Sequence, residues 1–347
     1  MSILTVESIN FSYPDNKVIN NLSFDLEEGE ILCVLGESGC GKSTLFHCIS
    51  GFEDISSGSI SYNGEIISSN NFTKSPETRN ISLVFQDYAL FPHLNIEQNI
   101  RFAIRKSSKK DQDKILNDVL CLVNLEKENK KYPHELSGGQ QQRVAIARSI
   151  ASGSKLILFD EPFSNLDPTL RKSLRLELRE ILKKAKISAI FITHDQNEAY
   201  DIADRIAILD NGQIIQEATP REIYQGPKNL FVANFLGSKN TIPAKYNNDK
   251  NTFYCPLFEM QATCKHDSNR SYFFYIPSDA ISTELCDKNK YMFKVISSQF
   301  RGDHFHLALE CNDIQLQLSR SSSDMEGFCD DELCLYFDFD KIRIITN

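Results

Sequence analysis

The 347-residue sequence predicts an α/β protein whose C-terminal part is rich in β-strands. Three observations lead to this prediction. Apolar runs of strand length alternate with segments in which apolar residues recur at helical spacing, as in layered α/β folds. A glycine-rich loop joins one of these runs to a helical segment. In residues 241–347 the periodicity changes towards two, which is typical of strands.

The N-terminal elements are predicted from apolar runs and turn residues. Residues 3–35 read as short strands broken by Asn, Pro and Gly, and the last of them, Ile31–Leu35, is apolar throughout. Such a run predicts a buried strand. A helix is expected from about Ser43 to Ile49. Two further strand-like runs flank Asn63-Gly64, a dipeptide that favours a hairpin.

The middle of the chain is expected to be helical from about Ile96 to Ala151, because apolar residues recur there at helical spacing. Strands and helices then alternate again. The expected elements are a strand at Leu156–Phe159, a helix at Leu170–Ala185, a strand at Ala189–Thr193, a helix at Glu198–Ala203 and a hairpin of Ile206–Leu209 with Gln213–Glu217. Parallel strands covered by helices follow from this order.

Two domains are expected from the length of the chain and from the change of periodicity. The first spans residues 1–237 and contains a helical subdomain at about 88–155. Short helices at Arg221–Tyr224 and Asn229–Phe235 are expected to complete it. Ser238-Lys239-Asn240 is a polar joint, and residues 241–347 form the β-rich domain. This second domain shows no clustered acid–base or metal constellation.

Composition narrows the class of protein. The net charge is −9 and neither domain is basic, so nothing in the sequence indicates nucleic-acid or anionic-membrane binding. The N-terminus lacks a signal-like region, and no apolar run approaches the roughly 20 residues of a membrane span. The ten cysteines form no CxxC pair. They are therefore expected to be reduced thiols of a cytoplasmic protein.

A phosphate-binding loop is predicted at Gly36-Glu-Ser-Gly-Cys-Gly-Lys42-Ser43. It lies between a predicted strand and a predicted helix, as the mechanism requires. Glycines let backbone N–H groups turn towards phosphate oxygens, and the helix N-terminus adds partial positive charge. Lys42 would reach the β- and γ-phosphates, and the Ser43 hydroxyl would bind Mg²⁺. The alternative is a glycine-rich turn that binds nothing.

Two acids, Asp160 and Glu161, end the apolar strand at Leu156–Phe159. Asp160 would hold Mg²⁺, directly or through its hydration water. Glu161 would polarise the attacking water as a general base. The alternative is that Asp160 only caps the segment after the strand.

A second anion-binding loop is predicted at Leu136-Ser-Gly-Gly-Gln140, which precedes a helix. Ser137 and the two glycines expose backbone donors at the helix N-terminus. One nucleotide does not need two such loops, so the second loop is expected to serve a nucleotide held by another copy of the chain. The alternative is a Ser N-cap with a glycine-rich entry.

These motifs, with their order along the chain, resemble the nucleotide-binding subunit of ABC transporters. The resemblance covers residues 1–237 and rests on the following motifs: the loop Gly36–Ser43, Gln86 in Val-Phe-Gln-Asp, the signature Leu136–Gln140, the acids Asp160 and Glu161, Ser164–Asp167, and Thr193-His194-Asp195. It implies a P-loop NTPase fold of the ABC type, ATPase activity, and ATP and Mg²⁺ as cofactors.

The resemblance also implies roles for single residues. Tyr13 would stack on adenine, Gln86 would touch Mg²⁺ and the attacking water, and His194 would contact the γ-phosphate. The implied nucleotide-binding set is Tyr13, Gly36, Glu37, Ser38, Gly39, Cys40, Gly41, Lys42, Ser43, Thr44 and Gln86. The implied catalytic residues are Glu161, His194 and Gln86, and the implied Mg²⁺ ligands are Ser43, Gln86 and Asp160. The implied contacts to the partner chain's nucleotide are Lys131, Ser137, Gly138, Gly139, Gln140 and Asp167.

Each of these roles has a structural alternative. Tyr13 alone reads as a half-buried aromatic at a strand end, and Gln86 as a loop amide. His194 alone reads as a hydrogen-bonding residue at a strand end, and Lys131 as a solvated lysine beside Lys130.

The kind of transporter is inferred from the domain composition. Exporters usually fuse the ATPase to membrane helices, whereas this chain pairs it with a β-rich part. That part resembles the small barrel-like domain, of OB or TOBE type, found in importers of iron, polyamines, sulfate and sugars. The family's Arg-Pro-Glu is replaced here by Ile276-Pro277-Ser278, which puts any regulatory contact of that arginine in doubt. The expected assembly is a homodimer with two membrane-spanning permease subunits. The apolar run Tyr88–His93 would help to dock them through Phe91-Pro92-His93, and the alternative is that this run belongs to the core.

Ferric iron is the expected solute, delivered by a periplasmic solute-binding protein, and the chain would lie at the cytoplasmic face of the inner membrane. The resemblance to iron importers rests on Ser50–Glu53, Tyr88–His93, the stretch from Gly64 to Pro76 and the compact tail Phe293–Asn347. Polyamine, sulfate, sugar and phosphonate importers are alternatives. A soluble ABC ATPase that takes no part in transport is the alternative of another class.

Overall fold

The computed structural model describes residues 2–164, 166–237, 240–267, 269–283, 289–321 and 331–347. The chain divides into two compact units, Met1–Pro220 and Arg221–Asn347.

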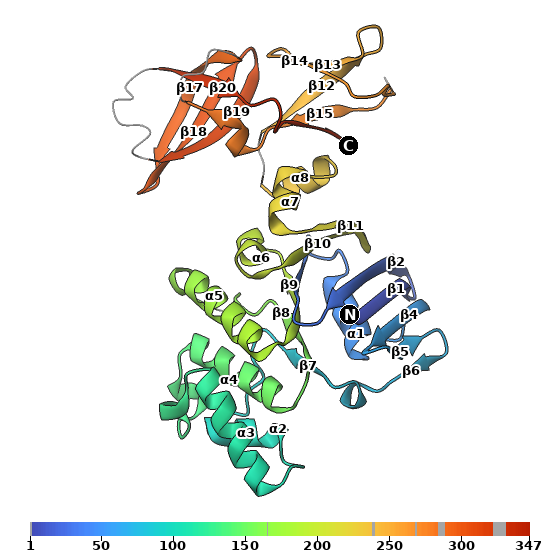
Figure 1. The fold of residues 1–347 in the computed structure, drawn as a ribbon, viewed down its shortest axis with the longest axis vertical. Coiled ribbons are helices and arrows are strands. Elements are labelled where there is room, and N and C mark those ends of the chain that lie inside the picture. The colour runs from blue at the N-terminus through green and yellow to red at the C-terminus, as the bar shows by residue number, and fades with distance from the viewer. Residues whose placement is uncertain (1, 165, 238–239, 268, 284–288, 322–330) are drawn as a thin grey trace. The chain divides into compact units, whose positions relative to one another are not determined.

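A six-stranded sheet forms the centre of the first unit, with strand order β11-β10-β3-β9-β8-β7 (Figure 1). Its members are β3 (Ile31–Leu35), β7 (Ile81–Val84), β8 (Leu156–Asp160), β9 (Ser188–Thr193), β10 (Arg205–Asp210) and β11 (Gln213–Ala218). All neighbours are parallel except β10 and β11, which form the predicted antiparallel hairpin. β3 and β9 are buried along their whole length, as strands covered on both faces should be. The predicted α/β core is therefore confirmed.

An antiparallel sheet with strand order β2-β1-β4-β5-β6 packs within the same unit. Its strands are β1 (Ser2–Tyr13), β2 (Asn16–Glu27), β4 (Ser57–Tyr62), β5 (Glu65–Ser69) and β6 (Phe72–Thr73). The prediction of short strands at residues 3–27 is wrong, because β1 and β2 each run for 12 residues. The polar residues Ser8 and Asn21 take left-handed backbone angles where the register shifts, so they form bulges inside long strands instead of ending them.

Helices flank the sheets of the first unit. They are α1 (Lys42–Ser50), α2 (Ile96–Ala103), α3 (Lys109–Leu122), α4 (Gly138–Ala151), α5 (Pro168–Ala185) and α6 (Gln196–Ile202). α2, α3 and α4 gather at one end of the unit, at the bottom of Figure 1, and correspond to the helical segment expected from about Ile96 to Ala151. Side chains define where these helices begin: Asn95 caps α2, Ser108 caps α3 and Asp195 caps α6.

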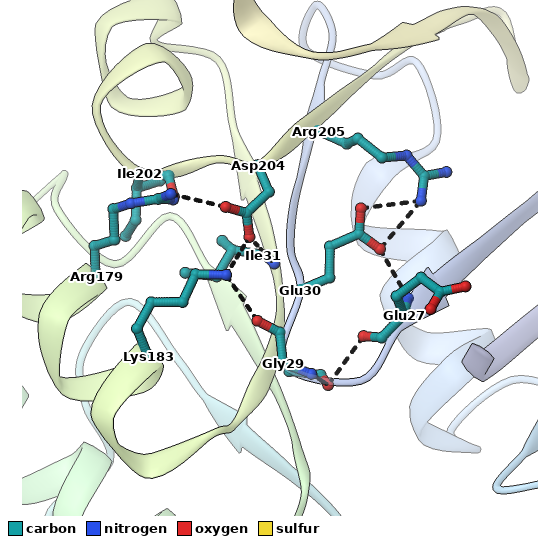
Figure 2. A network of polar contacts seen from close by, with 10 residues as sticks. Glu27, Gly29, Glu30, Ile31, Arg179, Lys183, Ile202, Asp204 and Arg205 are labelled. Atoms are coloured by element: carbon teal, nitrogen blue, oxygen red, sulfur yellow. Dashed lines mark hydrogen bonds and ion pairs between the residues drawn. The ribbon is translucent and has the colours of Figure 1, made fainter. Parts of the chain in front are cut away.

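A charged cluster ties α5 to the starts of β3 and β10 (Figure 2). Asp204 Oδ2 accepts hydrogen bonds from the Ile31 N–H at 2.8 Å and from Lys183 Nζ at 2.5 Å. Its other oxygen accepts one from Arg179 Nη2 at 2.7 Å. Burial acts to raise the pKa of Asp204, but these three donors outweigh burial and hold that pKa below its usual range. The cluster thereby fixes the strand that leads into the phosphate loop.

The second unit is rich in strands, as predicted. One five-stranded antiparallel sheet comprises β14 (Glu259–Gln261), β13 (Thr252–Tyr254), β12 (Thr241–Asn247), β15 (Tyr272–Tyr275) and β21 (Arg343–Thr346) in that order. A second comprises β16 (Ile281–Ser282), β20 (Glu332–Phe337), β17 (Lys290–Phe300), β18 (His304–Cys311) and β19 (Ile314–Ser321). Both sheets contribute to one core, which includes Phe253, Phe274, Phe293, Leu309 and Leu335.

Two short helices, α7 (Pro220–Gln225) and α8 (Leu230–Phe235), precede these sheets. Residues 221–235 belong to the second unit, whereas sequence analysis assigned them to the first domain. The Tyr275 hydroxyl donates to the Tyr224 carbonyl at 2.5 Å, and Ala233, Tyr275 and Ile345 share a small buried cluster. These contacts join segments far apart in sequence. Among the helices that the structure describes, none is both long and apolar enough to cross a membrane.

Candidate functional site

The candidate residues follow the carboxyl ends of four neighbouring parallel strands. Leu35 of β3 is in register with Thr193 of β9, and Ile192 is in register with Asp160 of β8. On the far side of β8, Val84 of β7 is in register with Phe159. The residues that follow these positions therefore meet at one edge of the sheet. In open α/β sheets, this edge is where ligands bind.

The loop at Gly36–Ser43 joins β3 directly to α1. Gly39 and Gly41 have φ angles of +85° and +109°, which side chains other than glycine rarely adopt. A Cβ at Gly36 would lie 2.4 Å from Cys40 Sγ and 2.5 Å from the Leu209 carbonyl oxygen. Glycine is therefore required at positions 36, 39 and 41 for the loop to adopt this backbone conformation.

Lys42 lies at the start of α1 with its side chain turned back into the loop. Its Nζ donates to the carbonyl oxygens of Gly36 at 2.8 Å and Glu37 at 2.7 Å, and the residue is only 7% exposed. Cys40 is also buried, whereas Ser43 is exposed on the first helical turn. The loop therefore exposes a hydroxyl at a helix N-terminus and holds an ammonium group within its turn, a set of groups that suits a phosphate with its cation.

Asp160 ends β8 and lies close to this loop. Burial raises the pKa of its carboxyl, and the neighbouring Glu161 raises it further. His47 and Lys42 act on this pKa in the opposite direction. A partly desolvated carboxylate beside a lysine is suited to hold a hydrated divalent cation. His47, on α1, was not singled out from the sequence.

Glu161 leaves β8 with a φ of +44°, an unfavourable angle for a residue with a side chain. Its N–H donates to the Ile192 carbonyl at 3.1 Å, which holds this turn against β9. Its Oε1 lies 3.1 Å from His194 Nδ1. Both side chains line a cavity of about 100 Å³. Strained residues of this kind cluster at functional sites.

The structure places Gln86 and Tyr13 on the surface of the first unit. Gln86 is exposed two residues after β7, at the sheet edge that also carries Asp160. Tyr13 ends β1, is 43% exposed and donates from its hydroxyl to Glu53 Oε1 at 3.3 Å. Its ring packs edge-on against Phe11, with the ring centroids 4.9 Å apart. The Tyr13 ring is therefore partly exposed at the end of β1.

The second predicted loop caps α4. Ser137 Oγ accepts from the Gln140 N–H at 3.4 Å, and Gln140 Oε1 accepts from the Ser137 N–H at 3.0 Å. This is a capping box, so both polar residues of the motif also have a structural role. Gly138 and Gly139 lie so close to Leu166 and Leu174 that a Cβ at either would come within 2.8 Å. Their N–H groups are in the first helical turn, where no intrahelical acceptor exists.

The two loops of one chain lie in different parts of the first unit. α4 is among the helices at the bottom left of Figure 1, whereas α1 lies to the right of the central strands. Near the signature, Lys131 Nζ pairs with Glu128 at 2.5 Å. Asp167 is exposed beyond the loop that follows Glu161.

Sequence reasoning missed Arg79, a buried residue that binds the C-terminal end of α1, the helix that follows the loop at Gly36–Ser43. It is 2% exposed, and its Nη1 donates to the carbonyls of Cys48 at 2.9 Å and Ile49 at 2.7 Å. These carbonyls end α1, where a positive charge is favourable. Gly51 leaves room for the guanidinium, since a Cβ there would lie 2.4 Å from Arg79 Nε. A lone arginine outside the motifs gives no sequence signal for this contact with the end of α1.

The segment at Tyr88–His93 is ordered by a buried amide. Asn99 of α2 is 0% exposed; its Oδ1 accepts from the Phe91 N–H at 2.9 Å and its Nδ2 donates to the Phe91 carbonyl at 3.1 Å. Arg148 lies over the Phe91 ring at 5.6 Å, and His93 is exposed. These contacts hold the segment in one conformation shortly after Gln86 in the chain, with His93 exposed.

The donor atoms at the sheet edge fit a magnesium nucleotide. The Ser43 hydroxyl, the Asp160 carboxylate and the Gln86 amide are hard oxygen ligands of the kind that Mg²⁺ prefers. In the described parts of the chain, no three His, Cys, Asp or Glu side chains come together as a metal cage. A cation here would therefore complete its coordination with water and phosphate oxygens, as Mg²⁺ commonly does.

Comparisons with known proteins agree with this reading. A family model described as ABC transporter matches residues 19–164. The spermidine/putrescine import ATP-binding protein PotA of Thermotoga maritima is 39% identical over 253 residues, which are 72% of this chain and 68% of that protein. The Fe(3+) ions import ATP-binding protein FbpC 2 of Haemophilus influenzae is 41% identical over 257 residues, covering 74% and 72%. A solved structure of cbiO1 from Clostridium perfringens, part of the ABC transporter complex cbiONQ, matches with a TM-score of 0.60 and 30% identity over 64% of this chain and 90% of that chain.

Proposed function

The chain belongs to the ABC transporter family as the ATP-binding subunit of an importer, and from this premise we propose that it powers the import of ferric iron. Such subunits bind ATP, are ATPases coupled to transport and work with membrane permease subunits. The support for iron is the 41% identity with the iron-import protein of H. influenzae, together with the segments Ser50–Glu53 and Tyr88–His93. Polyamines are the second candidate, because the relative from T. maritima is named for spermidine and putrescine.

Hydrolysis is assigned to the residues at the carboxyl edge of the central sheet. In this proposal Lys42 binds the β- and γ-phosphates, while Ser43, Asp160 and Gln86 hold Mg²⁺ directly or through water. The remaining loop residues, Glu37 to Gly41 and Thr44, surround the phosphates, and Tyr13 stacks on adenine. The observation that carries the assignment is the strand register, which brings the ends of β3, β7, β8 and β9 together.

Glu161 is the proposed general base. Its carboxylate would take a proton from the attacking water, and base catalysis of this kind contributes about 10²–10⁴-fold. The His194 contact at 3.1 Å would orient this carboxylate and bring an imidazole to the γ-phosphate. The sharp turn at Glu161 supports the proposal, because it directs the side chain towards β9.

The chain is proposed to act as a head-to-tail homodimer with two ATP molecules between opposite loops. Gly138 and Gly139 begin α4 in a part of the unit away from α1, and first-turn N–H groups have no intrahelical acceptor. In a dimer, these groups with Ser137 and Gln140 would face the partner's nucleotide, and Lys131 and Asp167 would lie along the same seam. The permease subunits would dock at Tyr88–His93, with a periplasmic solute-binding protein beyond them. The dimer would be peripheral, at the cytoplasmic face of the inner membrane.

Uptake measurements test the solute. Cells lacking this chain should lose ATP-dependent uptake of radiolabelled ferric iron, keep uptake of labelled spermidine and recover iron uptake with the wild-type chain. The Glu161→Gln chain should fail to restore iron uptake. If spermidine uptake is lost while iron uptake stays normal, the transported solute is a polyamine and not ferric iron. Normal uptake of both solutes would reject both.

A further inference from the structure

Two histidines lie side by side at the start of β18, in the second unit. His304 and His306 are two residues apart on a strand, so their side chains leave the same face of the sheet. Their Nε2 atoms are 3.2 Å apart, with the rings at 80° to each other and their centroids 4.8 Å apart. Sequence analysis singled out no metal constellation in this domain, because a His-x-His pair has meaning only once the strand is known.

Asp303 fixes the orientation of the first imidazole. Its Oδ1 lies 2.5 Å from His304 Nδ1, so this nitrogen carries the proton that is donated to the carboxylate. The lone pair of His304 is then on Nε2, which accepts a hydrogen bond from His306 Nε2 at 3.2 Å. For a metal to bind both Nε2 atoms, His306 has to carry its proton on Nδ1 instead. Pairing of a carboxylate with the far nitrogen of a histidine is the usual support of metal-binding imidazoles in proteins.

We propose that His304 and His306 bind one divalent transition-metal ion through their Nε2 atoms, with Asp303 as a positioning residue. Imidazole nitrogens bind zinc at about 2.0–2.1 Å, so two of them separated by an angle of 90–109° at the metal lie about 2.9–3.4 Å apart. The observed 3.2 Å falls within this range. Imidazole ligands suit Cu²⁺, Ni²⁺ and Zn²⁺ and do not suit Mg²⁺ or Ca²⁺.

The surroundings leave space for the rest of the coordination shell. His306 lines a cavity of about 560 Å³ within the second unit. Its cross-strand neighbours there are Gln299 and Ser319, which are polar and exposed. Arg301 lines the same cavity, where its Nη2 donates to Gln299 Oε1 at 3.5 Å, while the Asp303 carboxylate pairs with His304. With two protein ligands, the metal would complete its coordination with water.

Calorimetric titration of the full-length chain, without nucleotide, tests the site. NiCl₂ and ZnCl₂ should each bind with about one ion per chain, and excess Mg²⁺ should not compete. His304→Asn and His306→Asn should each weaken binding by at least about 100-fold, and Asp303→Asn by about 10-fold, since losing a supporting carboxylate costs 10–100-fold. Circular dichroism melting should be unchanged in the three variants, because these side chains are not part of the core.

Cys264 provides the matched control. Its Sγ lies 3.4 Å from His266 Nε2, in the same unit, so this pair is the alternative place for the ion that the test has to exclude. Cys264→Ser should leave nickel and zinc binding unchanged. Three outcomes would each overturn the proposal. They are loss of metal binding in Cys264→Ser, full affinity in the double variant His304→Asn with His306→Asn, and no metal binding by the wild-type chain. None of these outcomes depends on which solute is transported.

Discussion

His194 Nδ1 lies 3.1 Å from Glu161 Oε1, so the residue that follows β9 contacts the residue that follows β8. The two residues are 33 positions apart in sequence, and the parallel register of β8 with β9 brings them together. The contact links the proposed general base to the residue proposed to reach the γ-phosphate.

Replacement of Glu161 by glutamine should uncouple binding from hydrolysis. An amide keeps the shape of the side chain but does not take a proton from water, so ATPase activity should fall by about 10²-fold or more. ATP affinity, measured by calorimetry, should stay within about twofold of wild type. Glu180→Gln removes an exposed carboxylate from α5 and should leave both quantities unchanged. ATPase activity at the wild-type level in Glu161→Gln would remove this residue from its proposed role.

Mixed dimers should reveal shared nucleotide sites. Lys42→Ala damages the phosphate loop, and Ser137→Arg places a bulky charge where α4 begins. In a head-to-tail dimer of one chain of each kind, both lesions fall in the same site and the other site stays intact. ATP binding by an equimolar mixture should therefore exceed that of either variant alone, as measured by filter binding. A mixture that only averages the two variants would show that each chain forms its site alone.

Arg79→Met should destabilise the first unit. The change removes donors from the carbonyls of Cys48 and Ile49 and leaves them buried without partners. Chemical denaturation should show a loss of about 2–5 kcal/mol in the free energy of unfolding. Arg105→Met, at an exposed position over the Phe102 ring, should cost less than about 1 kcal/mol. Equal losses in both variants would show that Arg79 does not anchor α1.

The contribution of Asp204 should depend on pH. Because its pKa is lower in the folded chain than in the unfolded chain, its stabilisation is present above the unfolded value of about 3.9 and is lost as pH falls through the folded value. Asp204→Asn should therefore lower the free energy of unfolding by about 1–3 kcal/mol at pH 7. The gap between variant and wild type should shrink below about pH 4. If the difference in the free energy of unfolding between Asp204→Asn and wild type does not change as the pH falls below about 4, the Asp204 carboxylate is not the cause of that difference.

The fragment 1–240 should bind ATP, since every nucleotide motif ends by Asp195. Its α7 and α8 lack Tyr275 and Ile345, with which they pack in the full chain. Hydrogen exchange in residues 221–235 should therefore be faster in the fragment, while exchange in α1 stays the same. An insoluble fragment, or one that does not bind ATP, would show that the two units depend on one another.

Strands and turns could be predicted from the sequence where a short run of residues shows an apolar pattern or a turn dipeptide. The apolar runs at Ile31–Leu35 and Leu156–Phe159 became β3 and β8, and the hairpin at Asn63-Gly64 joins β4 to β5. The remaining elements depend on distant partners. β7 has only four residues and is recognisable as a strand by its pairing with β8. α7 and α8 pack against residues that lie far along the chain.

The same division holds for the candidate site. Glycine loops and strand-end acids have mechanisms that local sequence reveals, so their residues could be named in advance. The positions of Arg79 behind α1 and of His47 near Asp160 could not, because each follows from the tertiary packing of α1. The left-handed turn at Glu161 also lacks a sequence signal, since glutamate rarely adopts it.

The register that aligns β3, β9 and β8 limits how this chain can change over generations. Exchanges among Leu, Ile and Val inside β8 preserve the pleat and the packing, so such substitutions can accumulate. Deleting a single residue from β8 would turn each following side chain to the opposite face and direct Asp160 away from the phosphate loop. The length of these strands is therefore under stronger constraint than their composition, and insertions should be confined to the loops at the opposite edge of the sheet.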